Sequence, residues 1–320
     1  MSEMKILVTP SSLCKNQNSE AMKKLRAFSD DIVISALGRP MTEDELIDII
    51  GDIDGYIAGT DHITAKVIAK ADKLKVISRY GAGVDSVDLD AAKAKGIAVT
   101  NTPGANSQAV AELAFGHMLA LARKIEDQSQ DLKHGKWVSV VGKQLQGKTL
   151  GVLGFGNIGR RFAKMSTGLD MKVMAYDPFI SHDIIRANGA FPASLDEIYA
   201  NADVITMHLP LSDLTHHMID AEAISKMKDG VILINTARGG ILDEDAVYDG
   251  VVSGKIFGVG LDSYVTEPPK DCRLMELPNV ITTPHAGAHT KEAVENMSIM
   301  SVENVISVLS GEFCPNILNR

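Results

Sequence analysis

Short apolar runs alternate along the chain with longer segments whose apolar residues recur at helical spacing. In the first third of the sequence, the runs expected to form strands cover residues 5–9, 32–35, 55–58, 74–78 and 98–100. The segments between them are expected to form helices at residues 19–28, 42–50, 64–71 and 88–95, with Ser, Thr or Asp near their starts as caps. This alternation is typical of strand–helix–strand units with parallel sheets, so it predicts an α/β protein.

A second series of the same kind follows a Pro-Gly break at residues 103–104. Its expected strands cover residues 149–154, 172–177, 204–208, 231–235, 258–262 and 280–283, and a last helix is expected at 290–310. The helix expected at 107–124 is apolar on most of its sides, so another domain or another subunit is expected to cover it. We therefore expect two domains, one at residues 102–287 and the other formed by residues 1–101 together with 288–320.

Composition narrows the class of protein. The chain has 320 residues, of which 45% are hydrophobic and 23% charged, as in ordinary globular proteins with room for two domains. Its net charge of −9 disfavours a nucleic-acid-binding surface, which needs clustered Lys and Arg. The three cysteines are far apart and show no metal-ligand spacing, so we expect reduced thiols and no metal site. The first residues lack the pattern of a secretory signal and no long apolar run follows, so a cytoplasmic protein without a membrane span is expected.

The most specific local motif is a G-x-G-x-x-G sequence formed by Gly154, Gly156 and Gly159, between an expected strand and an expected helix. The first glycine permits a tight turn, the second lets a pyrophosphate approach the backbone, and the third lets helix and strand pack closely. Glycine-rich turns are common, but here the next expected strand ends in Asp177, where an acid would accept hydrogen bonds from a ribose. That carboxylate would repel a 2′-phosphate, so the sequence predicts binding of NAD rather than NADP.

Three side chains suited to chemistry follow expected strands of the same series: Arg238, Glu267 and His285. Ligands of open parallel sheets bind beyond the carboxyl ends of the strands, so these residues are expected near one crevice. A histidine supported by a carboxylate can transfer a proton near neutral pH, and a guanidinium suits a carboxylate or a polarised carbonyl. This combination fits interconversion of a 2-hydroxy acid and a 2-keto acid. Residues at strand ends are also commonly caps or surface residues, and periodicity alone does not choose between His285 and His208.

Together these segments resemble the D-isomer-specific 2-hydroxyacid dehydrogenase family over nearly the whole chain. The motifs that carry the resemblance lie at residues 151–160, 203–211, 234–240, 261–268 and 283–287. The resemblance implies two Rossmann-like domains with an active-site cleft between them, and it assigns the catalytic roles to Arg238, Glu267 and His285. It also implies that NAD is contacted, besides by the glycine loop, by Asn157, Ile158, Asp177, Leu209, Thr236, Ala237 and Asp262. It further implies a homodimer formed through the cofactor domain, which would cover the apolar helix at 107–124.

The loop at residues 79–85 resembles the family's cradle for the substrate carboxylate, whose backbone amides would face the anion. The substrate contacts implied there are Arg79, Gly81, Ala82 and Gly83. Asn106 is a further substrate-contact candidate, although an ordinary helix cap explains it equally well.

Within the family the resemblance is greatest to 3-phosphoglycerate dehydrogenases, which makes 3-phosphoglycerate the first expected substrate. Two departures bear on that expectation. The chain ends at Arg320, so the C-terminal regulatory domain of many such enzymes, with its serine feedback, is not expected. Residues 56–61 lack an arginine that members often use for the substrate phosphate, and Asp61 is expected to repel a phosphate. A glyoxylate/hydroxypyruvate reductase or D-lactate-type dehydrogenase is the alternative enzyme. An NAD-sensing regulatory protein is the alternative class, which the intact catalytic trio disfavours.

Overall fold

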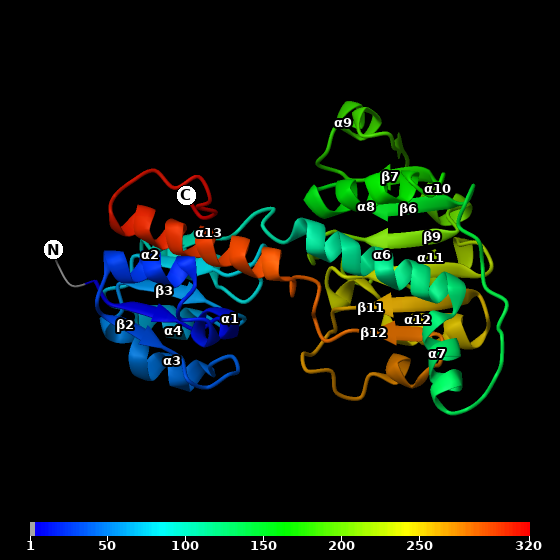
Figure 1. Cartoon of the computed structure of the whole chain (residues 1–320). Coiled ribbons are helices and arrows are strands. Elements are labelled where there is room, and N and C mark those ends of the chain that lie inside the picture. The colour runs from blue at the N-terminus through cyan, green and yellow to red at the C-terminus, as the bar shows by residue number, and fades with distance from the viewer. Residues whose placement is uncertain (1–3) are drawn as a thin grey trace. The chain divides into compact units, whose positions relative to one another are not determined.

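The computed structural model describes residues 4–320, which form two compact units. The first contains the chain up to Asn106 together with Thr290–Arg320, and the second contains Ser107–His289 (Figure 1). The boundaries expected from the sequence lie a few residues from these limits, and the exact extent of the domains stays a prediction. Each unit is built on its own parallel sheet, which confirms the predicted two-domain α/β fold.

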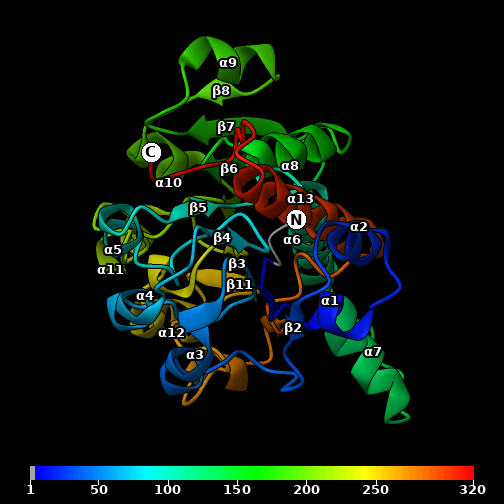
Figure 2. The same ribbon diagram turned by 90° about the vertical axis from the view of Figure 1, so that its left-hand side faces the viewer.

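The first unit has a five-stranded parallel sheet in the order β2-β1-β3-β4-β5. Its strands are β1 (Ile6–Val8), β2 (Ile32–Ile34), β3 (Gly55–Ala58), β4 (Val76–Arg79) and β5 (Ala98–Thr100). The helices are α1 (Ser11–Lys15), α2 (Glu20–Phe28), α3 (Glu43–Ile49), α4 (Ala65–Lys70), α5 (Leu89–Ala94) and α13 (Lys291–Leu309), with a 3-10 turn at Ile50–Asp52. Helices α2 and α13 lie on one face of this sheet, and α3, α4 and α5 lie on the other (Figure 2). Ile6 and Val8 pack with the first group and Leu7 with the second, as the strand period of two requires.

The second unit has a seven-stranded parallel sheet in the order β12-β11-β10-β9-β6-β7-β8. Its strands are β6 (Thr149–Leu153), β7 (Lys172–Tyr176), β8 (Phe191–Pro192), β9 (Val204–Met207), β10 (Val231–Asn235), β11 (Ile256–Leu261) and β12 (Val280–Thr282). The helices are α6 (Ser107–Arg123), α7 (Ile125–Lys133), α8 (Asn157–Thr167), α9 (His182–Ala187), α10 (Leu195–Asn201), α11 (Ala221–Lys226) and α12 (Glu244–Val252), with 3-10 turns at Gly239–Ile241 and Arg273–Glu276. The order reverses between β6 and β9, and such a reversal opens a crevice at the carboxyl ends of the strands.

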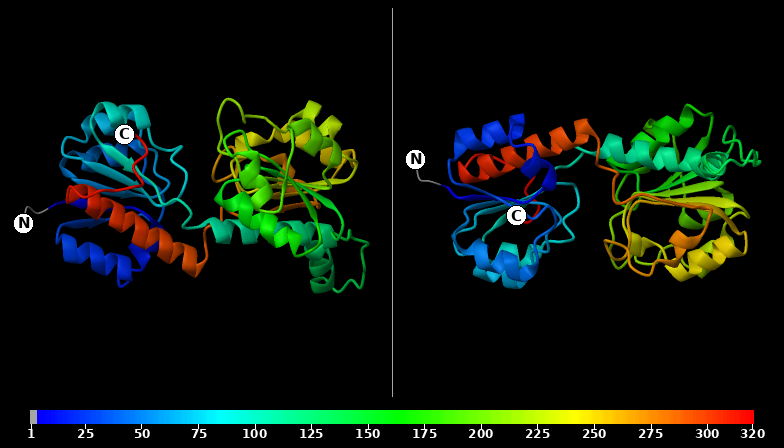
Figure 3. Two further views of the ribbon diagram at one scale, coloured as in Figure 1. Left: turned by 90° about the horizontal axis from the view of Figure 1, so that it is seen from above. Right: turned by 60° about the horizontal axis from the view of Figure 1, so that its bottom comes forward.

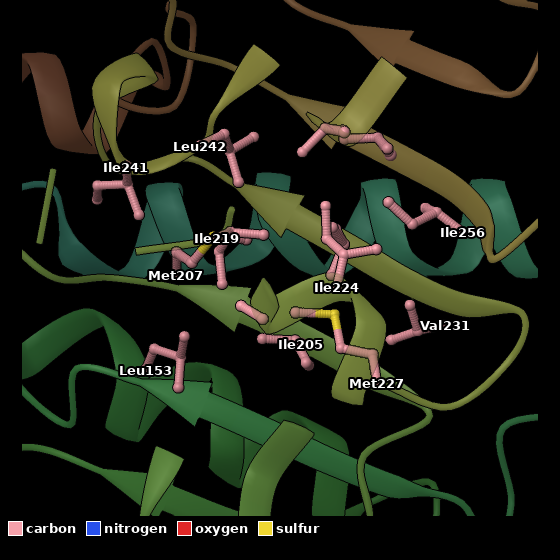
Figure 4. Close-up of a cluster of buried hydrophobic side chains, with 14 of the residues drawn as sticks. Leu153, Ile205, Met207, Ile219, Ile224, Met227, Val231, Ile241, Leu242 and Ile256 are labelled. Carbon is pink, nitrogen blue, oxygen red and sulfur yellow. The ribbon is translucent and has the colours of Figure 1, made fainter. Parts of the chain in front are cut away.

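Apolar side chains fill both faces of the seven-stranded sheet. Helices α6 and α8 cover one face of the sheet (Figure 3). There Met118 and Phe162 pack with Val152 and Ile234. On the opposite face, residues from α10, α11 and α12 form a second core, shown around Ile205 in Figure 4. Strands covered on both faces lack polar alternation, which explains the unbroken apolar runs that the sequence shows.

Side-chain caps fix where several helices begin, as the sequence indicated. The side chains of Ser19, Thr42, Thr64 and Asp88 each accept a hydrogen bond from a backbone amide in the first turn of the following helix. Among residues 4–320, no helix combines the length and the apolar content that crossing a bilayer requires.

Candidate active site

The turn after β6 has the geometry that the glycine motif predicts. Gly154 has a φ of +93°, and a Cβ atom there would lie 2.7 Å from the carbonyl carbon of His208. A Cβ atom on Gly159 would collide with the carbonyl oxygen of Gly154, whereas one on Gly156 would meet nothing within 4 Å. Gly154 and Gly159 therefore have no room for a side chain, because helix and strand pack closely there. The space beside Gly156 is empty, and a pyrophosphate could approach the backbone at this point.

The first turn of α8 faces the same loop. Gly156 is its N-cap, and no side chain caps the helix. The amides of Asn157 and Ile158 open this helix, where the positive end of the dipole favours an anion. The carboxamide oxygen of Asn157 accepts a hydrogen bond from Nη2 of Arg160 at 3.1 Å. The residues present thus fit a dinucleotide phosphate group.

Asp177 links the end of β7 to the glycine loop. Its Oδ2 accepts a hydrogen bond from the amide of Phe155 at 2.8 Å, and its Oδ1 accepts one from the amide of Phe179 at 2.9 Å. An ionised carboxylate has about four acceptor positions, so these two bonds leave capacity for the hydroxyls of a ribose.

The other residues expected to contact NAD lie at the ends of β9, β10 and β11. Leu209 and Ala237 are buried, at 6% and 9% exposure. The Thr236 hydroxyl is buried and has no hydrogen-bond partner within residues 4–320. A buried hydroxyl without a partner is costly, so this atom is poised for a ligand. The Asp262 carboxylate accepts hydrogen bonds from the Thr283 hydroxyl and from the amides of Ala286 and Gly287, and its expected contact with the nicotinamide stays a prediction.

Glu267 and His285 form a hydrogen-bonded ion pair. His285 Nδ1 lies 2.7 Å from Glu267 Oε2, while Glu267 Oε1 accepts a hydrogen bond from the Tyr264 amide at 3.1 Å. Burial alone would raise the pKa of Glu267, but the His285 partner, the Tyr264 amide and the Arg238 charge together lower it. The hydrogen bond that His285 makes to Glu267, together with the negative charge of Glu267, raises the pKa of His285 against the opposing effects of burial and Arg238. His285 is therefore held ready to carry a proton near neutral pH, and about half of its side chain stays exposed, at 48%.

Arg238 lies in the turn that follows β10. Its Nη1 donates a hydrogen bond to the carbonyl of Ala237 at 2.7 Å, and its charge acts on both members of the His285–Glu267 pair. The side chain of Asn235, a residue that the sequence did not single out, stabilises this turn through two hydrogen bonds to its backbone. Its buried side chain accepts from the Ala237 amide at 3.1 Å and donates to the Arg238 carbonyl at 2.8 Å. The signal available in the sequence was an amide side chain at the end of an apolar strand, three residues before the candidate arginine.

The remaining histidines differ from His285 in their partners. His208, the alternative left open by the sequence, pairs its Nε2 with the Thr206 hydroxyl at 3.0 Å, and burial lowers its pKa to about 3. It therefore stays neutral and no carboxylate orients it. His216 and His217 stack on each other with ring centres 3.9 Å apart. His217 Nδ1 also lies 4.0 Å from Asp243 Oδ2, which is too far for a hydrogen bond, whereas His285 is hydrogen-bonded to its carboxylate at 2.7 Å.

The loop expected to cradle a carboxylate follows β4 in the first unit. The guanidinium of Arg79 is buried and donates to the carbonyls of Gly83, Ala58 and Gly59. The Gly81 amide is already bonded to the Arg79 carbonyl and to the Thr102 hydroxyl. The amides of Ala82 and Gly83 have no hydrogen-bond partner in the described chain, so these two remain for an anion.

Asp61, which was expected to repel a phosphate, lies inside the first unit. Its side chain is fully buried and accepts hydrogen bonds from the amides of Met41 at 2.7 Å and Gly59 at 3.0 Å and from the Thr9 hydroxyl. A carboxylate surrounded by three donors inside its own unit organises the loop and does not face a ligand. Asp61 is therefore not placed to touch a substrate phosphate, and the expected repulsion by its charge stays a prediction. Asn106 makes no cap bond, since its Oδ1 has no partner in the part of the chain described here.

Comparison with known proteins decides the family. Residues 115–287 match the model of the D-isomer specific 2-hydroxyacid dehydrogenase NAD binding domain. The chain is 45% identical over 275 residues to hydroxypyruvate reductase of Thermotoga maritima, an alignment that covers 84% of this chain and 89% of that protein. It belongs to the D-isomer specific 2-hydroxyacid dehydrogenase family. The second unit is accordingly an NAD-binding domain, which confirms the predicted family and cofactor.

Two further relatives of this dehydrogenase family member bear on its substrate. It is 41% identical over 321 residues to D-3-phosphoglycerate dehydrogenase of Methanocaldococcus jannaschii, which covers 99% of this chain and 59% of that protein. It is 31% identical to the crystal structure of D-lactate dehydrogenase from Aquifex aeolicus, complexed with NAD and lactic acid, with a TM-score of 0.86 and 99% of each chain covered. The chain thus spans less than two thirds of the phosphoglycerate dehydrogenase but nearly all of the lactate dehydrogenase. The names of these relatives support both the first expected substrate and the alternatives, and they do not choose between them.

Proposed function

We propose that this protein is an NAD-dependent D-2-hydroxyacid dehydrogenase that interconverts a small D-2-hydroxy acid and its 2-keto acid. The observation that carries the proposal is the 2.7 Å pair of His285 and Glu267, with the charge of Arg238 acting on both, at the strand ends of an NAD-binding domain. A proton donor and a cation at one site are what reduction of a carbonyl requires from the protein.

The residues divide the chemistry between them. When bound, the cofactor would supply a hydride as NADH for reduction of the keto acid, or accept one as NAD⁺ during oxidation of the hydroxy acid. In reduction, the imidazolium of His285 donates its Nε2 proton to the oxygen formed on C2, and in oxidation the neutral ring takes that proton back. Glu267 holds Nδ1 and stabilises the charged ring. Arg238 polarises the carbonyl and holds the substrate's oxygens through its planar fork.

The cofactor would be held as the sequence predicted. We assign the pyrophosphate to Gly154, Gly156 and Gly159 with the helix amides of Asn157 and Ile158, supported by the open space at Gly156. Asp177 takes the ribose hydroxyls. The remaining contacts are assigned to Leu209, Thr236, Ala237 and Asp262, supported by the unpaired Thr236 hydroxyl.

The substrate carboxylate is assigned to the unpaired amides of Ala82 and Gly83, in the loop that begins at Gly81. Arg79 shapes this loop through the Gly83 carbonyl, and direct contacts of Arg79 and Asn106 with the substrate stay predictions. Because Asp61 is fully buried, it makes no direct contact that would reject a phosphorylated substrate. We retain 3-phosphoglycerate as the first candidate, with glyoxylate, hydroxypyruvate and pyruvate as the alternatives.

A panel of keto acids tests the proposed activity. Oxidation of NADH is followed with phosphohydroxypyruvate, hydroxypyruvate, glyoxylate and pyruvate, and NADH binding is measured separately by fluorescence. We expect turnover of at least one acid to its D-hydroxy product. Tight NADH binding without turnover of any of them would support the regulatory alternative, and turnover to an L-product would contradict the assignment of family chemistry to this site.

Replacing Glu267 with glutamine is expected to shift the pH profile of keto-acid reduction to lower pH. Glu267 raises the pKa of His285, and reduction needs the protonated ring, so activity is lost as pH rises through that pKa. Without the carboxylate of Glu267 the pKa of His285 falls. The alkaline limb of the kcat/KM profile therefore moves to lower pH. Glu276→Gln, an exposed acid of the same unit, serves as the control and should leave the limb in place. An unshifted limb in Glu267→Gln would show that this pair does not set the profile.

Replacing Asp177 with asparagine is expected to weaken NADH binding by roughly tenfold or more and to improve NADPH relative to NADH. Asparagine can keep one acceptor for the Phe155 amide, so the loop is disturbed less than by alanine. Dissociation constants for both cofactors, measured by fluorescence, check this. A preference for NADPH in the unmutated protein would contradict the role given to Asp177.

We propose a homodimer formed through the NAD-binding domain. Helix α7 and the segment after it expose many apolar side chains: Ile125, Leu132, Trp137, Val138, Val140 and Val141. Trp137 and Val141 are more than nine-tenths exposed, at 92% and 91%. Apolar residues gathered on one exposed segment mark an interaction surface, and we commit to a second copy of this chain as its partner.

Sedimentation tests the dimer, and Trp137→Glu with Val141→Glu should yield a monomer with unchanged far-UV circular dichroism. Trp137 is the sole tryptophan of the sequence, so its emission should shift to shorter wavelength as the dimer forms. A monomeric wild-type protein at micromolar concentration would contradict this proposal.

A cytoplasmic location is also proposed. Cys14, Cys272 and Cys314 are all free thiols, as is usual in a reducing compartment. Cell fractionation with an antibody to the protein tests the location.

A further inference from the structure

A buried histidine, His117, contacts the segment that leads into the loop of His285. His117 belongs to α6 and is 4% exposed. Its ring packs over Gly260 of β11, where a Cβ atom would lie 2.8 Å from His117 Cβ and 2.9 Å from its Nδ1. The glycine in this strand therefore makes room for the imidazole, which the mechanism above does not use.

His117 is the first member of a hydrogen-bonded chain that leads to the catalytic loop. Its Nε2 lies 3.3 Å from the Thr283 hydroxyl, and that hydroxyl lies 2.6 Å from Asp262 Oδ1. A hydroxyl has a single proton, and the short contact with a carboxylate shows that Thr283 donates it to Asp262. His117 Nε2 must then be the N–H donor to Thr283.

The state of the second ring nitrogen agrees with this direction. Nδ1 of His117 is buried without a hydrogen-bond partner among residues 4–320. An unpaired lone pair there costs less than an unpaired N–H would. Burial lowers the pKa of His117, against the opposing charge of Asp262, so the ring is neutral.

The last link is the backbone of the His285 loop. Asp262 Oδ1 accepts from the Ala286 amide at 2.7 Å, and Oδ2 accepts from the Gly287 amide at 2.8 Å. His285 itself has a φ of +49°, a left-handed conformation that costs energy for a residue with a side chain. The two amides that follow it are thus held by one buried carboxylate, whose third donor is Thr283.

We propose that His117 is a positioning residue for proton transfer: by donating to Thr283 it directs that hydroxyl onto Asp262, whose carboxylate holds the loop of His285. The inference rests on the proposed function, because it assumes that His285 transfers the proton. The inference gives His117, a residue of α6 that does not contact the reacting atoms, an indirect effect on proton transfer by His285.

Paired variants test the chain of bonds. His117→Met fills the space without a donor, and His117→Gln restores an N–H at similar reach. We expect His117→Met to lower kcat/KM for the keto acid roughly three- to tenfold, the size of one lost hydrogen bond, and His117→Gln to stay within about twofold of the unmutated enzyme. Thr283→Val should cause a loss of similar or larger size. In the Thr283→Val background, His117→Met should add less than about twofold, because the path is already broken.

Nuclear magnetic resonance gives a readout that does not depend on activity. The ¹⁵N signals of His117 should show a protonated Nε2 and a bare Nδ1 at neutral pH. The amide signals of Ala286 and Gly287 should move in His117→Met and stay near their original positions in His117→Gln. A protonated Nδ1, unmoved amides, or equal kcat/KM in the Met and Gln variants would overturn the inference. If the amide signals move as expected but the protein turns over no keto acid, the proposed function is overturned. The hydrogen-bonded chain from His117 to the His285 loop would then still be supported.

Discussion

Replacing His285 with glutamine is expected to lower kcat by roughly 10²–10⁴, while the affinity for NADH changes little. Glutamine can still hydrogen-bond to Glu267, but it has no proton that it can transfer near neutral pH. The keto oxygen would then have to take its proton from water as the hydride arrives. Since His285 is assigned to the substrate oxygen and not to the dinucleotide, the loss should appear in turnover and not in cofactor binding.

Steady-state kinetics and NADH fluorescence titration measure the two effects separately. His289→Gln is the matched control, because this exposed histidine lies four residues further along the same loop and is assigned no role. The control should keep turnover within about twofold. Turnover in His285→Gln within a factor of about three of the unmutated enzyme would remove His285 from the mechanism.

Replacing Arg238 with glutamine is expected to lower kcat/KM for the keto acid by roughly 10²–10³. The guanidinium is the cation proposed to polarise the carbonyl as negative charge develops on its oxygen. Its loss has a second consequence, because the charge of Arg238 opposes the rise in the pKa of His285. The alkaline limb of the reduction profile should therefore move to higher pH in this variant, opposite to the shift expected for Glu267→Gln.

The alkaline limb should move to higher pH in Arg238→Gln and to lower pH in Glu267→Gln. These opposite directions distinguish the loss of the Arg238 charge from a general disturbance of the site. A pH series of kcat/KM records both the loss and the shift, and Arg238→Lys distinguishes charge from geometry, since lysine keeps the charge without the planar fork. Arg273→Gln, which removes a surface guanidinium stacked on Tyr248, is the control. A large loss in the control, or none in Arg238→Gln, would contradict the assignment.

The sequence predicts most strands because a strand covered on both faces must be apolar throughout. The expected strands at 55–58, 98–100 and 231–235 coincide with β3, β5 and β10. It does not predict β8, whose two residues, Phe191 and Pro192, are too few for a pattern and include an exposed aromatic ring. The expected helix at 107–124 ends where α6 ends, but the sequence does not predict α7, which begins directly after Lys124 takes a left-handed φ of +53°.

The sequence predicts which residue types form the site, but it does not predict most of the contacts between their side chains. The position of Arg238, Glu267 and His285 after strands indicates that they meet at one edge of the sheet, and the pairing of His285 with Glu267 is a matter of side-chain geometry. Local sequence does not tell whether a polar side chain faces a ligand or its own backbone. Asp61 illustrates this, since its carboxylate is used by amides within its own unit. Asn235 is the converse case, a buried amide whose role appears only once the Arg238 turn is folded.

The central claim is that His285 and Arg238 act on the same substrate oxygen. A crystal structure of the protein bound to NADH and a non-reactive keto-acid analogue such as oxamate tests it directly. The account predicts His285 Nε2 and an Arg238 nitrogen each within about 3.2 Å of the analogue's carbonyl oxygen, with Glu267 still on Nδ1. A bound analogue whose carbonyl oxygen contacts neither group, with the imidazole of residue 285 turned to solvent, would contradict it.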